Sequence, residues 1–212
     1  MTIDDKQLKM DPSYDRSDAD VTLISSEDVQ FRVDSFYLKA ASTVLRDMLG
    51  NKDLQSSPIH IDAPAEDVKQ LLDFMTAPIA PTITDWKQFQ RILELANKFD
   101  CGGVIDRLRL RSRGFLLERP WSIFCLASHW NDMSLARSSI ERMAVDENVA
   151  KLTSKKVPMP LSLASNCSFP YLLGFLSSVR VNELNCYVND PYSGSTALID
   201  WRKTGMDFTP AS

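Results

Sequence analysis

The strongest constraint on this fold is a stretch near the N-terminus in which apolar and polar side chains alternate. The alternation runs across Val29–Val33, and a run rich in β-branched residues, Val21–Ile24, precedes it. The residues between them, Ser25–Asp28, are polar and favour a turn. Because neighbouring side chains of a strand point to opposite faces, this pattern predicts a β-hairpin whose second strand has one buried face.

Helical spacing follows the hairpin. Two short helices are predicted at Phe36–Ala41 and Val44–Leu49, and a third short strand at Ile59–Ile61. The apolar face of a longer helix is spaced at i, i+3, i+4 and i+7 and consists of Val68, Leu71, Leu72 and Met75. A small sheet flanked by helices is therefore expected in this part of the chain.

The following residues carry helical patterns and no strand pattern, until the periodicity is lost after about Asn182. Thr84–Asp85 begins an amphipathic helix, Gly102–Gly103 is predicted to end it, and an arginine-rich helix follows from Val104 to about Leu117. From Pro120 onward we expect paired short helices. The predicted fold class is α+β, with a three-stranded sheet and a cluster of helices, followed by an all-α extension.

Four arginines alternate in the arginine-rich helix, at positions 107, 109, 111 and 113. At about 100° per residue, Arg107 and Arg111 share one helix face and Arg109 and Arg113 share the opposite face. The charges are thus split between two faces. We expect a solvated or acid-paired helix, and the alternative is a contact for phosphate or an acidic partner.

The distribution of charge excludes several classes of partner. Residues 1–76 carry 8 basic and 15 acidic side chains, whereas residues 77–212 carry 16 basic and 13 acidic ones. Neither part has the strongly basic balance of a nucleic-acid binder, and an acidic first part disfavours an anionic membrane surface. No apolar run of about 18 residues is present, so a membrane-spanning helix is not expected.

The cysteines and the N-terminus indicate the compartment. The four cysteines, Cys101, Cys125, Cys167 and Cys186, form no C-x-x-C pair, so we expect reduced thiols in an intracellular protein. The segment 1–20 holds six aspartates and has no apolar core, so it does not resemble a secretory signal. The predicted location is the cytoplasm, the nucleus or both.

The sequence is poor in residues that carry catalysis. It contains two histidines, His60 within a predicted strand and His129 near a predicted helix end, and both are interpreted as structural. No nucleophile elbow, zinc-binding helix motif, Walker loop or dinucleotide-binding glycine motif occurs. We therefore expect no enzyme activity, no catalytic or metal-binding residue, no cofactor and no small-molecule substrate.

Specific segments now connect the chain to a known family. The segment DADVTLISSEDVQFRVDSFYLKAASTVLRDML, residues 18–49, closely resembles the opening of a BTB/POZ domain. SPIHIDAPAEDVKQLLDFM resembles the third strand and third helix of that domain, and ITDWKQFQRILELANKFDCGGVIDRLR, residues 83–109, its closing helix pair. The proline-rich connection and the helical continuation are most similar to the BTB-domain proteins of fungi. Asp34 departs from the family, where a histidine is common.

The resemblance implies an organisation in four parts. Residues 1–17 are expected to be a flexible acidic N-terminus and residues 18–118 the BTB/POZ domain. Residues 119–182 resemble the helical extension, called BACK, that follows BTB domains in ligase adaptors. Residues 183–212 are expected to be a C-terminal tail that is partly ordered or disordered.

The resemblance also implies a function in protein–protein interaction. It predicts a non-catalytic module that self-associates and scaffolds complexes.

 The expected partner is a second copy of the chain, and the expected form is a homodimer. A cullin scaffold is the further expected partner, with the chain as substrate adaptor of a cullin-type ubiquitin ligase. The alternative is a transcriptional regulator or corepressor-binding protein.

Five residues are the predicted partner contacts. Phe36, Tyr37 and Leu38 lie in the first predicted helix, which we expect to form the dimer contact. The cullin-contact pattern of the family is an apolar residue, any residue and then glutamate after the third helix. Residues 76–82 contain no glutamate, and Ile83 to Asp85 is a shortened version of the pattern.

Overall fold

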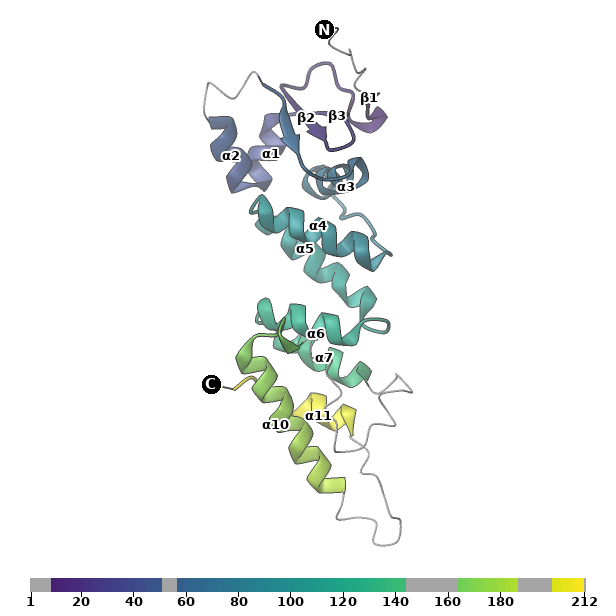
Figure 1. Cartoon of the computed structure of the whole chain (residues 1–212), viewed down its shortest axis with the longest axis vertical. Coiled ribbons are helices and arrows are strands. Elements are labelled where there is room, and N and C mark those ends of the chain that lie inside the picture. Colours follow the sequence, from purple (N-terminus) through teal and green to yellow (C-terminus); the bar gives the residue numbers. More distant parts are fainter. Residues whose placement is uncertain (1–8, 51–56, 144–163, 187–199, 212) are drawn as a thin grey trace, which may run out of the picture. The chain divides into compact units, whose positions relative to one another are not determined.

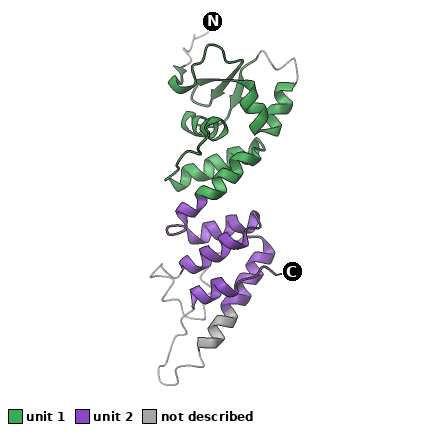
Figure 2. Ribbon diagram, turned by 180° about the vertical axis from the view of Figure 1, so that it is seen from behind, with its two compact units in different colours: residues 1–111 green, residues 112–212 purple. Residues whose placement is uncertain are grey.

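The computed structural model describes residues 9–50, 57–143, 164–186 and 200–211. The chain divides into two compact units, residues 1–111 and residues 112–212, which are coloured separately in Figure 2. The division lies near the end of an α-helix, α5 (Gly102–Ser112), and precedes the predicted domain boundary after residue 118.

The first unit contains a mixed sheet of four strands in the order β1-β3-β2-β4 (Figure 1). The strands are β1 (Lys9–Met10), β2 (Val21–Ser25), β3 (Val29–Val33) and β4 (Ile59–Ile61). β2 and β3 form the predicted antiparallel hairpin, and β4 pairs parallel with β2. Ser25 holds the turn, because its hydroxyl accepts hydrogen bonds from the Glu27 and Val29 N–H groups at 3.3 and 3.2 Å.

The N-terminal segment corrects two predictions. A flexible segment was expected over residues 1–17, of which 1–8 lie outside the described residues. In the described part, β1 pairs parallel with β3 and a 3₁₀ turn, η1, follows at Pro12–Tyr14. The sheet therefore has a fourth strand beyond the predicted three. The Asp11 N–H donates to the Gln30 carbonyl at 2.9 Å, which extends the pairing into the turn. A strand of two residues is too short to show alternation, so only its tertiary pairing reveals it.

The helices of this unit supply the rest of its core. They are α1 (Ser35–Ala41), α2 (Thr43–Gly50), α3 (Ala65–Thr76), α4 (Trp86–Lys98) and α5. The predicted stripe of α3 is confirmed at Val68, Leu71 and Leu72, which are buried, whereas Met75 is half-buried and Phe74 takes the buried place beside them. The buried Asp67 carboxylate pairs with the Arg91 guanidinium at 2.5 and 3.1 Å and so links α3 to α4.

The break between α4 and α5 differs from the prediction. Gly102–Gly103 was expected to end the helix, but α4 ends at Lys98 and both glycines lie in the first turn of α5. The chain turns at Asp100, which has a left-handed φ of 49°. Aspartate tolerates that conformation, and the Asp100 carboxylate also accepts a hydrogen bond from the Thr43 hydroxyl at the start of α2.

All the regular secondary structure among the described residues of the second unit is helical. After a 3₁₀ turn, η2 (Arg113–Phe115), it contains α6 (Pro120–His129), α7 (Met133–Met143), α10 (Phe169–Cys186) and α11 (Trp201–Asp207). Its core is a cluster of aromatic rings in contact with one another, formed by Trp121, Phe124, Tyr171, Phe175, Trp201 and Phe208.

Two of those rings belong to the predicted C-terminal tail. Trp201 and Phe208 are buried, and the Ala211 N–H donates to the Pro170 carbonyl at 2.8 Å. Residues 200–211 are thus an integral part of the second unit. α10 also continues to Cys186, beyond the predicted end of the helical extension at residue 182.

Candidate interaction surface

Two aromatic side chains project from the first turn of α1. Phe36 is 72% exposed and Tyr37 is 38% exposed. Their rings meet edge to face, with centroids 5.5 Å apart and an interplanar angle of 77°. Large apolar side chains that share an exposed site are typical of protein–protein contacts. Phe36 and Tyr37 are called the α1 surface below.

The start of α1 is fixed by the loop that precedes β2. The Ser35 N–H donates to the Asp20 carboxylate at 2.6 Å, which satisfies one of the free donors at the helix start. Arg16 bonds Asp34 at 3.0 Å and Asp18 at 2.7 Å. The hydrogen bond from Arg16 also lowers the pKa of the Asp18 carboxyl. Polar contacts of the N-terminal segment therefore border the α1 surface.

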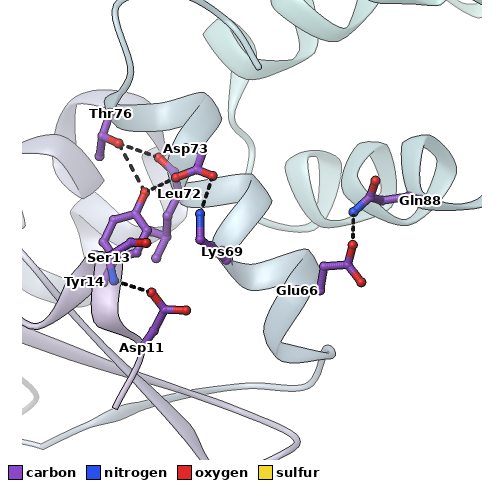
Figure 3. Close-up of polar contacts among 9 residues, drawn as sticks. All are labelled: Asp11, Ser13, Tyr14, Glu66, Lys69, Leu72, Asp73, Thr76 and Gln88. Atoms are coloured by element: carbon purple, nitrogen blue, oxygen red, sulfur yellow. Dashed lines mark hydrogen bonds and ion pairs between the residues drawn. The ribbon is translucent and has the colours of Figure 1, made fainter. Parts of the chain in front are cut away.

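Tyr14 attaches the N-terminal segment to α3. Its hydroxyl donates to the Asp73 carboxylate at 2.7 Å and lies 3.4 Å from the Thr76 hydroxyl (Figure 3). Lys69 pairs with the same carboxylate at 2.9 Å and stands 5.9 Å from the centre of the Tyr14 ring. Burial, with a further contribution from Asp73, raises the pKa of the Tyr14 hydroxyl, which therefore stays protonated as a donor. The Tyr14 ring also packs edge-on against Phe31.

A cavity of about 180 Å³ lies between these elements. Its lining comes from the N-terminal segment, β3, α1 and the end of α3 and includes Arg16, Arg32, Tyr14, Tyr37 and Thr76. Tyr37 therefore faces a hollow that is bordered by two guanidinium groups. Phe36 and Tyr37 form an apolar ridge with a polar recess beside it.

The structure places the other predicted contact residues elsewhere. Leu38 is fully buried, so the α1 surface consists of Phe36 and Tyr37 without it. Ile83 is also buried, and the Asp85 carboxylate accepts hydrogen bonds from the Lys87 and Gln88 N–H groups at the start of α4. Ile83 therefore packs in the core and Asp85 caps α4, so both residues of the shortened cullin-contact pattern have structural roles in this domain.

The family model of the BTB/POZ domain matches residues 10–110 of this chain. Residues 10–110 are a BTB/POZ domain. The match begins within β1, so the two-stranded edge formed by β1 and β3 belongs to the domain. The family match does not test the predicted similarity to fungal proteins, which stays a prediction. The search of curated proteins found no match.

The BTB domain is a protein-interaction domain, and its fold is the predicted α+β class.

An exposed apolar side chain that no sequence pattern predicted lies in the loop after α3. Ile79 is 80% exposed, although it stands between Pro78 and Ala80 in the predicted proline-marked connection. Its exposure depends on how the loop is held, which the local sequence does not show.

Two arginines hold this loop. Arg107 donates to the Phe74 and Ala77 carbonyls at 2.9 and 2.8 Å, and Arg111 donates to the Ala80 carbonyl. The prediction of a solvated or acid-paired helix is wrong for these two residues, because Arg107 binds carbonyl oxygens at the end of α3 and Arg111 binds a carbonyl oxygen of the loop. The loop is thereby fixed in the conformation that exposes Ile79.

The described residues show little that suggests catalysis. Among them, no cluster of three or more His, Cys, Asp or Glu side chains is placed to hold a metal ion. His60 points away from the buried Ile59 and Ile61, as predicted, and the Nε2 of His129 donates to the Asn166 carbonyl at 2.7 Å. Within the described part of the chain, no helix is long and apolar enough to cross a bilayer.

Proposed function

We propose that this chain is a non-catalytic scaffold that self-associates through the α1 surface and recruits a cullin as a ubiquitin-ligase adaptor. The exposed Phe36–Tyr37 pair is the observation that supports self-association. A twofold contact would place the same two rings of both copies against each other. The proposal includes an intracellular location, because cullins act inside cells.

The energy available from this contact is sufficient to detect by mutation. Burying a phenylalanine side chain contributes about 1.5–3 kcal/mol. Because Phe36 is already partly covered, roughly 1–2 kcal/mol per copy is available, and a twofold interface uses it twice. Since about 1.4 kcal/mol corresponds to a tenfold change in affinity, Phe36→Asp should weaken the dimer by roughly 30-fold or more.

Light scattering of the full chain tests self-association. The parent should have a mass near twice 23.9 kDa, and Phe36→Asp and Tyr37→Asp should shift it toward a single chain. Ile79→Asp is the matched control, since it places the same charge on another exposed apolar residue of this domain. A monomeric parent, or equal dissociation by all three variants, would refute self-association through α1.

The loop after α3 supports the cullin part of the proposal. Ile79 is the apolar side chain that this loop presents, and Arg107 and Arg111 hold the loop rigidly. A preorganised loop binds with a smaller loss of conformational entropy. Adding the N-terminal part of a cullin should raise the mass of the parent and of Phe36→Asp, but not that of Ile79→Asp. A dimer whose mass does not change when the cullin fragment is added would contradict the adaptor role and favour a corepressor partner.

A further inference from the structure

The second unit contains a pair of cysteine thiols in contact. Cys125 lies in α6 and Cys167 lies just before α10. The Ser128 hydroxyl donates to the Cys125 carbonyl at 2.7 Å and accepts from the Ser168 N–H at 2.9 Å, so the two cysteines are neighbours in space and their thiols interact. Cys125 is 5% exposed, whereas Cys167 is half-buried. A small reagent therefore reaches Cys167 first. The two residues are far apart in sequence, so their proximity is not visible in any local motif.

Neighbouring polar groups hold Cys167 against α6. The Ser168 N–H donates to the Ser128 hydroxyl at 2.9 Å, and the Ser168 hydroxyl donates to the Ser128 carbonyl at 3.3 Å. His129 bonds the Asn166 carbonyl on the other side. Residues 166–168 are therefore anchored to the last turn of α6, which keeps the two sulfur atoms together.

The two thiols differ in protonation. The hydrogen bond from Cys125 lowers the pKa of Cys167 to about 7, and the same contact, with burial, raises the pKa of Cys125. Cys167 is the more exposed of the two thiols, and the thiolate is the reactive form, so Cys167 is the nucleophile of the pair and the buried Cys125 is the thiol that resolves it. Cys101 provides a contrast, because burial raises its pKa to about 11.

We propose that Cys125 and Cys167 form a redox-active dithiol that closes to an intramolecular disulfide when hydrogen peroxide is the oxidant. The Cys167 thiolate attacks one peroxide oxygen, which breaks the O–O bond, forms the sulfenic acid and releases hydroxide. The Cys125 sulfur then displaces the sulfenic hydroxyl, and its proton completes the second water molecule. Two electrons pass from the two sulfurs to the peroxide. This inference does not depend on the proposed function of the BTB domain.

Peptide mapping of the full chain tests the proposal. Each of the four cysteines falls in a different tryptic peptide, with Cys125 in 114–137 and Cys167 in 157–180. After treatment with hydrogen peroxide and blocking of the remaining thiols, we expect these two peptides to be linked through a disulfide that dithiothreitol cleaves. Cys101, in peptide 99–107, should remain a free thiol and serves as the internal control.

A stability measurement provides a second, independent result. Because the disulfide joins α6 to the start of α10, oxidation should raise the melting temperature of the parent. Oxidation of Cys167→Ser, whose side chain is half-buried, should leave its melting temperature unchanged. Overoxidised Cys167 without a link, a link to Cys186, or a disulfide between two chains would each overturn the proposal.

Discussion

Gly174 offers a sharp test of how the C-terminal residues pack. A Cβ atom at this position of α10 would lie 2.1 Å from the Thr209 carbonyl oxygen and 2.9 Å from the Thr209 carbonyl carbon. Ordinary contact begins near 3.4 Å, so Gly174→Ala requires the backbone of the C-terminal segment to move by about 1.3 Å. Both clashing atoms belong to the backbone, so no side-chain rotation relieves the contact.

The expected cost follows from what that movement breaks. It would strain the hydrogen bond from Ala211 to Pro170, worth about 0.5–1.5 kcal/mol. It would also displace Phe208, whose complete loss would cost about 3–5 kcal/mol and whose partial displacement costs roughly 2 kcal/mol. Alanine regains about 1 kcal/mol of helix propensity. The net loss is therefore roughly 1–3 kcal/mol, or about 5 °C or more in the melting temperature.

Calorimetry of three variants measures this effect. Gly114→Ala is the matched control in the same unit, because no atom lies within 4 Å of its Cβ, and it should be neutral or slightly stabilising. In a chain that ends at Asp207, Gly174→Ala should cost nothing. If Gly174→Ala melts at or above the parent temperature in the full chain, the C-terminal segment does not pack against α10.

Three further predictions concern other parts of the chain. Leu72→Asp should unfold the BTB domain, since a carboxylate on this buried face has no partner, and a circular dichroism melt like that of the parent would contradict the assignment. Tyr14→Phe should lower the free energy of unfolding by about 1–2 kcal/mol in urea titrations, because Asp73 loses a hydrogen bond and keeps the one from Lys69. Iodoacetamide should modify Cys167 at a rate that rises through about pH 7, as its thiolate forms; a rate that rises only above pH 9 would refute the lowered pKa.

The strands and helices of the BTB domain were predictable where their side chains follow a period. The alternation across Val29–Val33 and the stripe of Val68, Leu71 and Leu72 record which face of each element is buried. These patterns are local, so they are visible without tertiary contacts. Lys9–Met10 shows no such pattern, because two residues pair with β3 only through backbone hydrogen bonds.

The candidate surface was predictable only in part. Phe36 and Tyr37 were expected at the surface and are exposed, but the next residue, Leu38, is in the core. A helix turns by about 100° per residue, so neighbours in sequence differ in burial once the helix is docked. In the loop after α3, Ile79 is exposed and Ile83 is buried, and no local period of the sequence distinguishes the two.

The sequence by itself determined the α+β class, the hairpin, the buried face of α3 and the resemblance to BTB domains. These depend on short-range periodicity and on motifs that are contiguous in the chain. The tertiary structure alone decided that Arg107 binds carbonyl oxygens, that Phe208 completes an aromatic core and that Cys125 contacts Cys167. Each of these contacts joins residues far apart in sequence, and only the packing of whole elements brings such residues together.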